Sequence, residues 1–155
     1  MADTAPPPSP VPDGGVLDEG VHRLALRVYW EDTDAGGIVY HASYIRWMER
    51  GRTEFLRALG LDQREMMASG TRFVVNSINI RFRRPALFDD SLMVSTQCTT
   101  LRAASLILHQ RVMRGAEGMA NAEVLCAAID ETDRPMRMPD SCRRRIALAP
   151  VGNTS

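Results

Sequence analysis

Alternating apolar and polar positions predict several β-strands along this chain. From Leu24 to Trp30, apolar side chains occupy every second position, which is typical of a strand with one buried face. Between Val74 and Asp130 the same alternation occurs four more times, and Arg114 to Gly118 is predicted to form a hairpin connection. The positions expected on the buried faces are Val74, Ile78, Ile80 and Phe82; Leu92, Val94, Thr96 and Cys98; Leu106, Leu108, Gln110 and Val112; and Ala120, Ala122, Val124, Cys126 and Ala128.

A spacing of three and four residues predicts one long helix over residues 43–59. Ser43 is a candidate N-cap for this helix, and Gly60 stands where a helix commonly ends. Gly51 costs about 1 kcal/mol relative to alanine inside a helix, which indicates close packing against a neighbouring element. The predicted buried stripe consists of Tyr44, Ile45, Met48, Phe55, Leu56 and Leu59.

The order of these elements is one strand, one helix and four further strands. This order predicts an α+β architecture, an antiparallel sheet of about five strands wrapped around one central helix. A helix with a single apolar stripe leaves a sheet edge uncovered, so we expect a homo-oligomer.

The two ends of the chain differ in composition from the middle. Five of the nine prolines lie in the first twelve residues, so residues 1–20 are predicted to form a disordered arm. Residues 21–148 are then the folded domain, and residues 149–155 are a loose tail.

Composition excludes several classes of function. The 155 residues carry 19 basic and 19 acidic side chains, so the zero net charge implies no broad attraction to nucleic acid. All basic residues are arginine, which excludes mechanisms that need a lysine Schiff base or a P-loop lysine. No apolar run is long enough to span a membrane and no secretory signal precedes the domain, so we expect a cytoplasmic protein. Cys98, Cys126 and Cys142 are too far apart for metal-binding spacing and are expected to be reduced thiols.

The loop before the predicted helix carries the candidate chemistry. Between Trp30 and His41 it contains three carboxylates, two glycines and one histidine. The first turn of a helix offers free N–H groups that can polarise a carbonyl, and a nearby carboxylate can attack it or activate water. From the residues alone, an acid-rich turn whose carboxylates cap the helix and neighbouring turns is the better explanation, because Asp and Gly are ordinary turn residues.

The motif in this loop resembles a known enzyme family. The run RVYWEDTDAGGIVYHASY at 27–44, followed by MERGRTEFL at 48–56, closely resembles the 4-hydroxybenzoyl-CoA thioesterase family of hotdog folds. Within that family it is most similar to the bacterial group encoded beside the Tol–Pal system, whose members hydrolyse acyl-CoA. Weaker similarity continues to about Pro139. The resemblance implies a hotdog fold, an acyl-CoA substrate with acyl carrier protein as a further acyl donor, no metal or other cofactor, and a dimer or tetramer.

The resemblance assigns roles to particular residues. Asp34 matches the family's catalytic carboxylate, and His41 matches an assisting histidine whose backbone N–H polarises the thioester carbonyl. Trp30 stands where the group usually has tyrosine, and its indole can donate but not accept a hydrogen bond. Arg83 and Arg84 are candidates for the coenzyme A phosphates, although a solvated strand edge explains them as well. The expected substrate-binding residues are Trp30, Gly36, Gly37, Tyr40, Arg83 and Arg84.

Two alternatives stay open at this point. One is an aromatic acyl-CoA thioesterase of the 4-hydroxybenzoyl type. The other is a binding module for acyl-CoA or acyl carrier protein that has lost turnover because of Trp30. A hotdog enoyl-CoA hydratase is disfavoured, because the helix side lacks the D-x-x-x-x-H signature.

Overall fold

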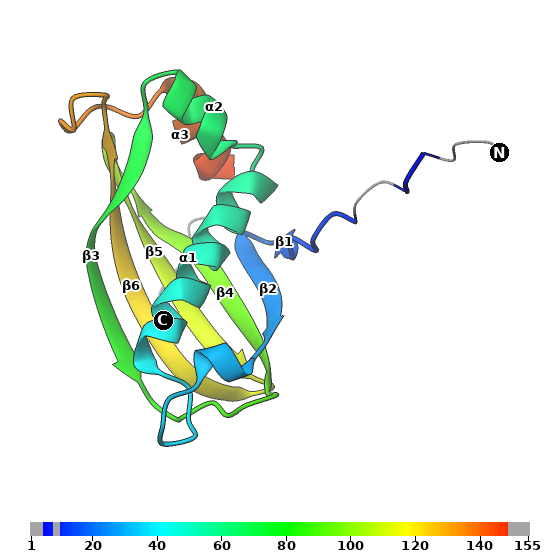
Figure 1. The fold of residues 1–155 in the computed structure, drawn as a ribbon. Coiled ribbons are helices and arrows are strands. Elements are labelled where there is room, and N and C mark those ends of the chain that lie inside the picture. Colours follow the sequence, from blue (N-terminus) through cyan, green and yellow to red (C-terminus); the bar gives the residue numbers. More distant parts are fainter. Residues whose placement is uncertain (1–4, 8–9, 149–155) are drawn as a thin grey trace.

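The computed structural model describes residues 5–7 and 10–148 and shows an antiparallel sheet curled around one long helix (Figure 1). Its elements are β1 (Val16–Asp18), β2 (Val21–Arg27), a 3₁₀ turn (Trp30–Asp32), α1 (His41–Ala58), α2 (Gln63–Ala68), β3 (Arg72–Phe82), β4 (Ser91–Leu101), β5 (Ser105–Arg114), β6 (Glu117–Ile129) and α3 (Asp140–Leu148). Within the described residues the sheet has six strands in the order β1-β2-β4-β5-β6-β3. The predicted α+β hotdog architecture is confirmed, and β1 adds one strand to the expected five.

Helix α1 packs on the inner face of the sheet, and its closest approach is at Gly51. A Cβ atom at this position would lie 2.9 Å from both Thr96 Oγ1 and Val94 Cγ1, so no larger residue fits without movement. Gln110 is fully buried beside it and donates hydrogen bonds to the Met48 carbonyl (2.8 Å) and to Thr96 Oγ1 (2.9 Å). These bonds satisfy the N–H donors of the buried amide group. The close packing predicted from Gly51 is therefore confirmed.

The alternation predicted for β4, β5 and β6 is confirmed position by position, but β3 differs. The pairing of β3 with β6 shifts register between Val75 and Ser77. Because of this bulge, Val75 rather than Val74 shares a face with Ile78 and the residues that follow it. Among the described strands β3 pairs with β6 alone and therefore forms an edge of the sheet, where Phe82 is 47% exposed.

The start of the ordered region corrects two expectations. Val16–Asp18, inside the stretch expected to be a loose arm, pairs with β2, so ordered structure begins before residue 21. Next to this strand, the buried His22 side chain holds the Gly14 carbonyl through Nε2 at 2.8 Å. β2 ends at Arg27, so Trp30 does not continue its buried face and instead opens the 3₁₀ turn. Residues 149–155, expected to be a loose tail, lie outside the described residues, as do residues 1–4 and 8–9.

The ends of α1 place the candidate loop. The helix begins at His41 and has Tyr40 as its N-cap, so Ser43 is not the cap that the sequence predicts. Its hydroxyl donates instead to the Asp32 carbonyl (3.1 Å). Gly60 follows the helix with a φ of +80°, which agrees with the predicted stop. The loop before α1 projects from the end of the molecule opposite α2 and α3 (Figure 1).

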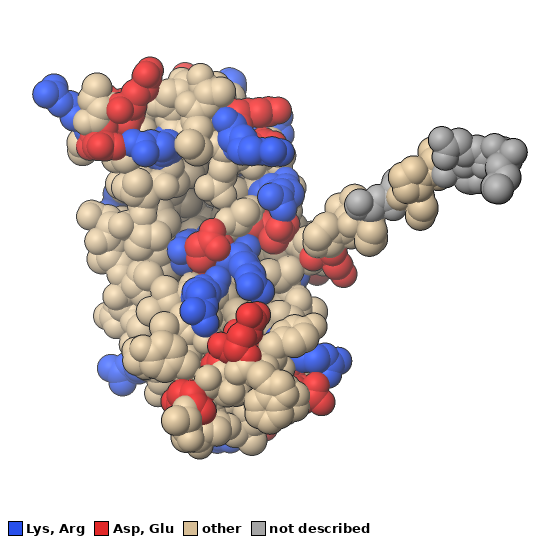
Figure 2. All heavy atoms as spheres, in the orientation of Figure 1, with Lys and Arg blue, Asp and Glu red and all other residues tan. Residues whose placement is uncertain are grey.

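Two further observations bear on binding. Among the described residues, none of the helices is both long and apolar enough to cross a membrane. Basic and acidic side chains also lie close together on the face seen in Figure 2, which offers no large area of one charge.

Candidate active site

The loop between β2 and α1 is built around a buried acid, Asp32. Its carboxylate accepts a hydrogen bond from the Tyr29 N–H (2.9 Å), and its carbonyl accepts from the Tyr40 N–H (2.8 Å). These bonds, with the Ser43 hydroxyl, join the two ends of the loop. Asp32 therefore has a structural role, which explains one of the three acids that the sequence placed here.

Asp34 lies at the exposed tip of this loop. Its N–H donates to the Ile38 carbonyl (2.9 Å), and its carbonyl accepts from Gly37 N–H (3.1 Å), where φ is +81°. One carboxylate oxygen, Oδ1, accepts from the Gly36 N–H (2.8 Å). The other oxygen has no hydrogen-bond partner within the part of the chain that the structure describes. The turn thus orients the Asp34 carboxylate and leaves one oxygen free to react.

An open cavity of about 410 Å³ lies between the start of α1, the end of β3 and the segment that follows β3. Four of the eight predicted site residues, Asp34, His41, Arg83 and Arg84, line it together. The remaining lining residues are Ile38, Val39, Tyr44, Phe82 and Pro85. An acid, a helix N-terminus and two arginines from distant parts of the sequence therefore line the same cavity.

The helix N-terminus provides hydrogen-bond donors at this cavity. His41 is the first residue of α1, and no described residue accepts a hydrogen bond from the backbone N–H of His41 or Ala42. Free N–H groups at the positive end of the helix dipole favour an oxygen that gains negative charge. The cavity therefore combines a carboxylate with hydrogen-bond donors at the positive end of a helix dipole.

The other four predicted residues lie outside the lining of the cavity. Gly36, Gly37 and Tyr40 belong to the loop around Asp34, and the Tyr40 ring lies 4.4 Å from the His41 ring, centroid to centroid. Trp30 is 71% exposed and stacks on Phe88, with ring centroids 3.7 Å apart.

Two aromatic residues of the cavity were missed by sequence reasoning. Tyr44 resembles an ordinary core residue of the helix stripe, but its hydroxyl accepts a hydrogen bond from the Ala86 N–H (3.0 Å). Burial raises the pKa of Tyr44, although the Ala86 bond partly opposes this. Phe82 was assigned to a buried strand face, yet it lies 5.5 Å from the Tyr44 ring and 6.2 Å from the His41 ring, centroid to centroid. In the sequence, the one signal that Phe82 belongs to the site was its position next to Arg83-Arg84-Pro85.

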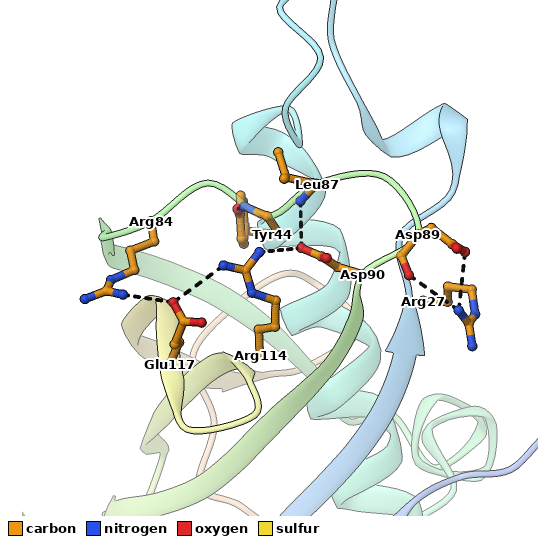
Figure 3. Close-up of polar contacts among 9 residues, drawn as sticks. Arg27, Tyr44, Arg84, Leu87, Asp89, Asp90, Arg114 and Glu117 are labelled. Atoms are coloured by element: carbon orange, nitrogen blue, oxygen red, sulfur yellow. Dashed lines mark hydrogen bonds and ion pairs between the residues drawn. The ribbon is translucent and has the colours of Figure 1, made fainter.

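The two arginines of the cavity are held from β6 and its hairpin. Arg83 Nε donates to Asn121 Oδ1 (3.3 Å), and Arg84 Nη1 donates to Glu117 Oε2 (2.8 Å). The backbone N–H groups of both arginines donate to the Met119 carbonyl. Figure 3 shows Arg84 within a chain of charged side chains along this edge. Both side chains remain exposed, as binding of a phosphate group would require.

The cysteines lie apart from this chemistry. Cys98, Cys126 and Cys142 are free and buried, in agreement with the expected reduced thiols. Burial raises the pKa of Cys98 to about 11, so this thiol is not a reactive nucleophile at neutral pH.

Comparison with known proteins identifies the family of this chain. Residues 28–146 match the family model described as the thioesterase-like superfamily. Acyl-CoA thioester hydrolase YbgC of Escherichia coli is 42% identical over 127 residues, which cover 81% of this chain and 95% of that protein. Acyl-CoA thioesterase YbgC of Haemophilus influenzae is 40% identical over 116 residues, which cover 74% of this chain and 85% of that protein.

A solved structure leads to the same family. The crystal structure of a probable thioesterase from Bartonella henselae has a TM-score of 0.73 and 39% sequence identity, and the match covers 77% of this chain and 99% of that one. The resemblance seen in the sequence is thereby confirmed. The chain belongs to the thioesterase-like superfamily of hotdog-fold enzymes.

Proposed function

We propose that this enzyme hydrolyses acyl-CoA thioesters to the free acid and coenzyme A, with Asp34 as the catalytic carboxylate. The observation that carries the proposal is that Asp34 and the free N-terminal end of α1 line the same cavity. The YbgC relatives, an acyl-CoA thioester hydrolase and an acyl-CoA thioesterase, support the choice of acyl-CoA as substrate.

In this proposal the helix N-terminus acts on the thioester carbonyl. The His41 N–H donates to the carbonyl oxygen, which gains negative charge when the carbon is attacked. Such preorganised donors are among the strongest contributions to acyl-transfer catalysis. The His41 side chain, on the first residue of α1, assists the same reaction.

Asp34 supplies the attack on the carbonyl carbon by one of two routes. As general base, it takes a proton from water while the water oxygen attacks, the C–S bond breaks, and the proton then passes to the departing thiolate. As nucleophile, its free oxygen attacks directly, the C–S bond breaks and coenzyme A leaves as the thiolate. Water then hydrolyses the acyl–aspartyl anhydride, which restores the Asp34 carboxylate, releases the acid and supplies the proton that the thiolate takes up. Both routes give the same products, and neither calls for a metal or another cofactor.

The remaining predicted residues are proposed to bind substrate. Arg83 and Arg84 contact phosphates of coenzyme A at the rim, since guanidinium groups match phosphate oxygens. Gly36 and Gly37 keep the loop thin enough for the thioester to approach Asp34. Tyr40 and Trp30 contact the substrate from the edge of the loop.

We also propose that the active form is a homo-oligomer, a dimer or a tetramer. β3 is an 11-residue edge strand, and Val74, Val75 and Phe82 on it are exposed apolar residues. An edge of this length invites pairing with a second strand. Light scattering that shows a 17 kDa monomer at micromolar concentration would contradict this part of the proposal.

Release of coenzyme A from a panel of short, long and aromatic acyl-CoA esters, and from an acyl carrier protein thioester, tests the function. We expect turnover of at least one acyl-CoA class. Preference for aromatic esters would favour the 4-hydroxybenzoyl type. Tight binding of the panel without turnover would instead favour the binding module.

A further inference from the structure

The segment 83–90, whose residues 83–85 line the cavity, carries two neighbouring acid–arginine pairs (Figure 3). Asp89 pairs with Arg27 of β2, with 3.3 Å between Oδ1 and Nη1. Asp90 pairs with Arg114 of β5, with 2.7 Å between Oδ2 and Nη1. The two aspartates are adjacent in the sequence and each binds an arginine, but their carboxylates make different contacts.

The Asp90 carboxylate binds the backbone of the segment 83–90 as well as Arg114. The same oxygen that binds Arg114 accepts a hydrogen bond from the Leu87 N–H (2.9 Å). The side chains of Asp90 and Arg114 are only 20% and 31% exposed. Arg114 also reaches Glu117 (3.5 Å), which accepts from Arg84. One chain of polar contacts therefore links the hairpin between β5 and β6 to this segment.

The segment is in turn bonded to the loop that carries Asp34. The carbonyl of Ala86, a fully buried residue, accepts from the Val39 N–H (2.9 Å), and Ile38 forms an antiparallel bridge with Leu87. The Ile38 carbonyl accepts from the Asp34 N–H (2.9 Å). The path from Asp90 to the backbone of Asp34 therefore consists of hydrogen bonds and of the peptide bonds between neighbouring residues.

We propose that Asp90 and Arg114 are positioning residues, which fix the segment 83–90 and, through it, the Asp34 carboxylate relative to the helix N-terminus. The inference rests on the proposed function of Asp34. Neither residue lines the cavity, so their effect passes through the backbone.

The charge state of Asp90 suits this role. Burial opposes ionisation of Asp90, but the hydrogen bond from Leu87 and the Arg114 guanidinium outweigh it, so the pKa of this carboxyl lies below its usual value. Both contacts are therefore charge-assisted at neutral pH and stronger than neutral hydrogen bonds.

The Asp89–Arg27 pair provides a matched control one residue away. Its side chains are 66% and 53% exposed, and the Asp89 carboxylate binds Arg27 and no backbone N–H among the described residues. Exposed pairs of this kind contribute little to stability. Asp89 has a φ of +70°, which asparagine tolerates, so Asp89→Asn makes the same chemical change without backbone strain.

The first experiment compares Asp90→Asn with Asp89→Asn in acyl-CoA hydrolysis. We expect Asp90→Asn to lower kcat about 10- to 100-fold, because small displacements of reacting groups have effects of that size. KM should change by less than about threefold, because the backbones of Arg83 and Arg84 are also held by the Met119 carbonyl of β6, which the substitution does not touch. Asp89→Asn should keep kcat within about twofold of wild type.

A second set of variants tests whether the pair acts as a unit. Arg114→Gln should reproduce the loss of kcat, Arg114→Lys should recover part of it, and Asp90→Asn/Arg114→Gln should be no worse than the poorer single variant. Equal effects of Asp90→Asn and Asp89→Asn, or additive effects of the two Asp90–Arg114 variants, would overturn the proposal.

Hydrogen exchange supplies a readout that does not depend on turnover. Asp90→Asn should speed exchange of the Leu87 and Val39 amides, while Asp89→Asn should not. Faster exchange throughout the chain would mark general destabilisation and overturn the positioning role. A wild type that hydrolyses no acyl-CoA would refute the proposed function, whereas unchanged exchange in Asp90→Asn would refute the positioning inference itself.

Discussion

Asp32 and Asp34 stand two residues apart in one loop, yet the structure gives them opposite environments. Asp32 is 7% exposed, and both its carboxylate and its carbonyl bind backbone N–H groups of the same loop. Asp34 is exposed, has one free carboxylate oxygen and lines the cavity at the start of α1. The comparison teaches that one acid builds the loop, and the loop presents the other acid at the cavity.

The largest expected effect comes from removing the charge of Asp34. We expect Asp34→Asn to lower kcat by about 10²- to 10⁴-fold, because an amide cannot serve as general base or anionic nucleophile. The melting temperature should stay close to wild type, since the side chain is exposed. Glu31→Gln, at an exposed acid of the same loop, is the matched control and should retain activity. Wild-type turnover by a folded Asp34→Asn variant would contradict the catalytic role of Asp34.

Asp32 should show the reverse behaviour. Asp32→Ala removes a buried carboxylate and leaves the Tyr29 N–H without its acceptor, which is expected to cost about 1–3 kcal/mol of folding free energy. Thermal unfolding of Asp32→Ala beside Asp34→Asn measures the difference. An unchanged melting temperature for Asp32→Ala would contradict the structural role of Asp32.

A smaller effect is expected from acid pH at Asp90. The pKa of Asp90 is lower in the folded chain than its ordinary value of about 4, so its ionised form stabilises the fold above that pH. This contribution is lost as the pH falls from about 4 through the folded pKa. Asp90→Asn should therefore show a shallower loss of melting temperature between about pH 5 and pH 3 than wild type. An identical pH dependence in the two proteins would argue against the Leu87 and Arg114 contacts.

The smallest effect is expected at Trp30, which opens the turn that Asp32 completes. Because Trp30 is 71% exposed and stacked on Phe88, Trp30→Tyr should change kcat/KM by less than about tenfold, and by different factors for short, long and aromatic acyl groups. A uniform gain of about a hundredfold, or 2.7 kcal/mol, would show that the missing tyrosine hydroxyl takes part in the chemistry.

The contrast between the two acids also shows which features can be predicted from the sequence and which cannot. The alternation in β4 to β6, the long helix and the close approach at Gly51 follow from side-chain periodicity and volume, so they were predictable. Position 34 was identified by resemblance to a family motif, since spacing alone cannot distinguish two aspartates whose difference is burial.

Other features depend on contacts that no local pattern records. The bulge in β3 follows two adjacent valines, Val74 and Val75, either of which satisfies an alternating pattern. Strand β1 is only three residues long and exists because β2 offers it a partner. The part of Ala86 in linking the segment 83–90 to the Asp34 loop arises from backbone hydrogen bonds across 47 residues of sequence.

The most direct test of the account is the structure of Asp34→Asn with an acyl-CoA ester bound. We expect the thioester carbonyl oxygen about 2.7–3.1 Å from the His41 backbone nitrogen. The carbonyl carbon should lie next to the substituted side chain of residue 34. A thioester bound outside this cavity, or a carbonyl oxygen turned away from the start of α1, would contradict the account.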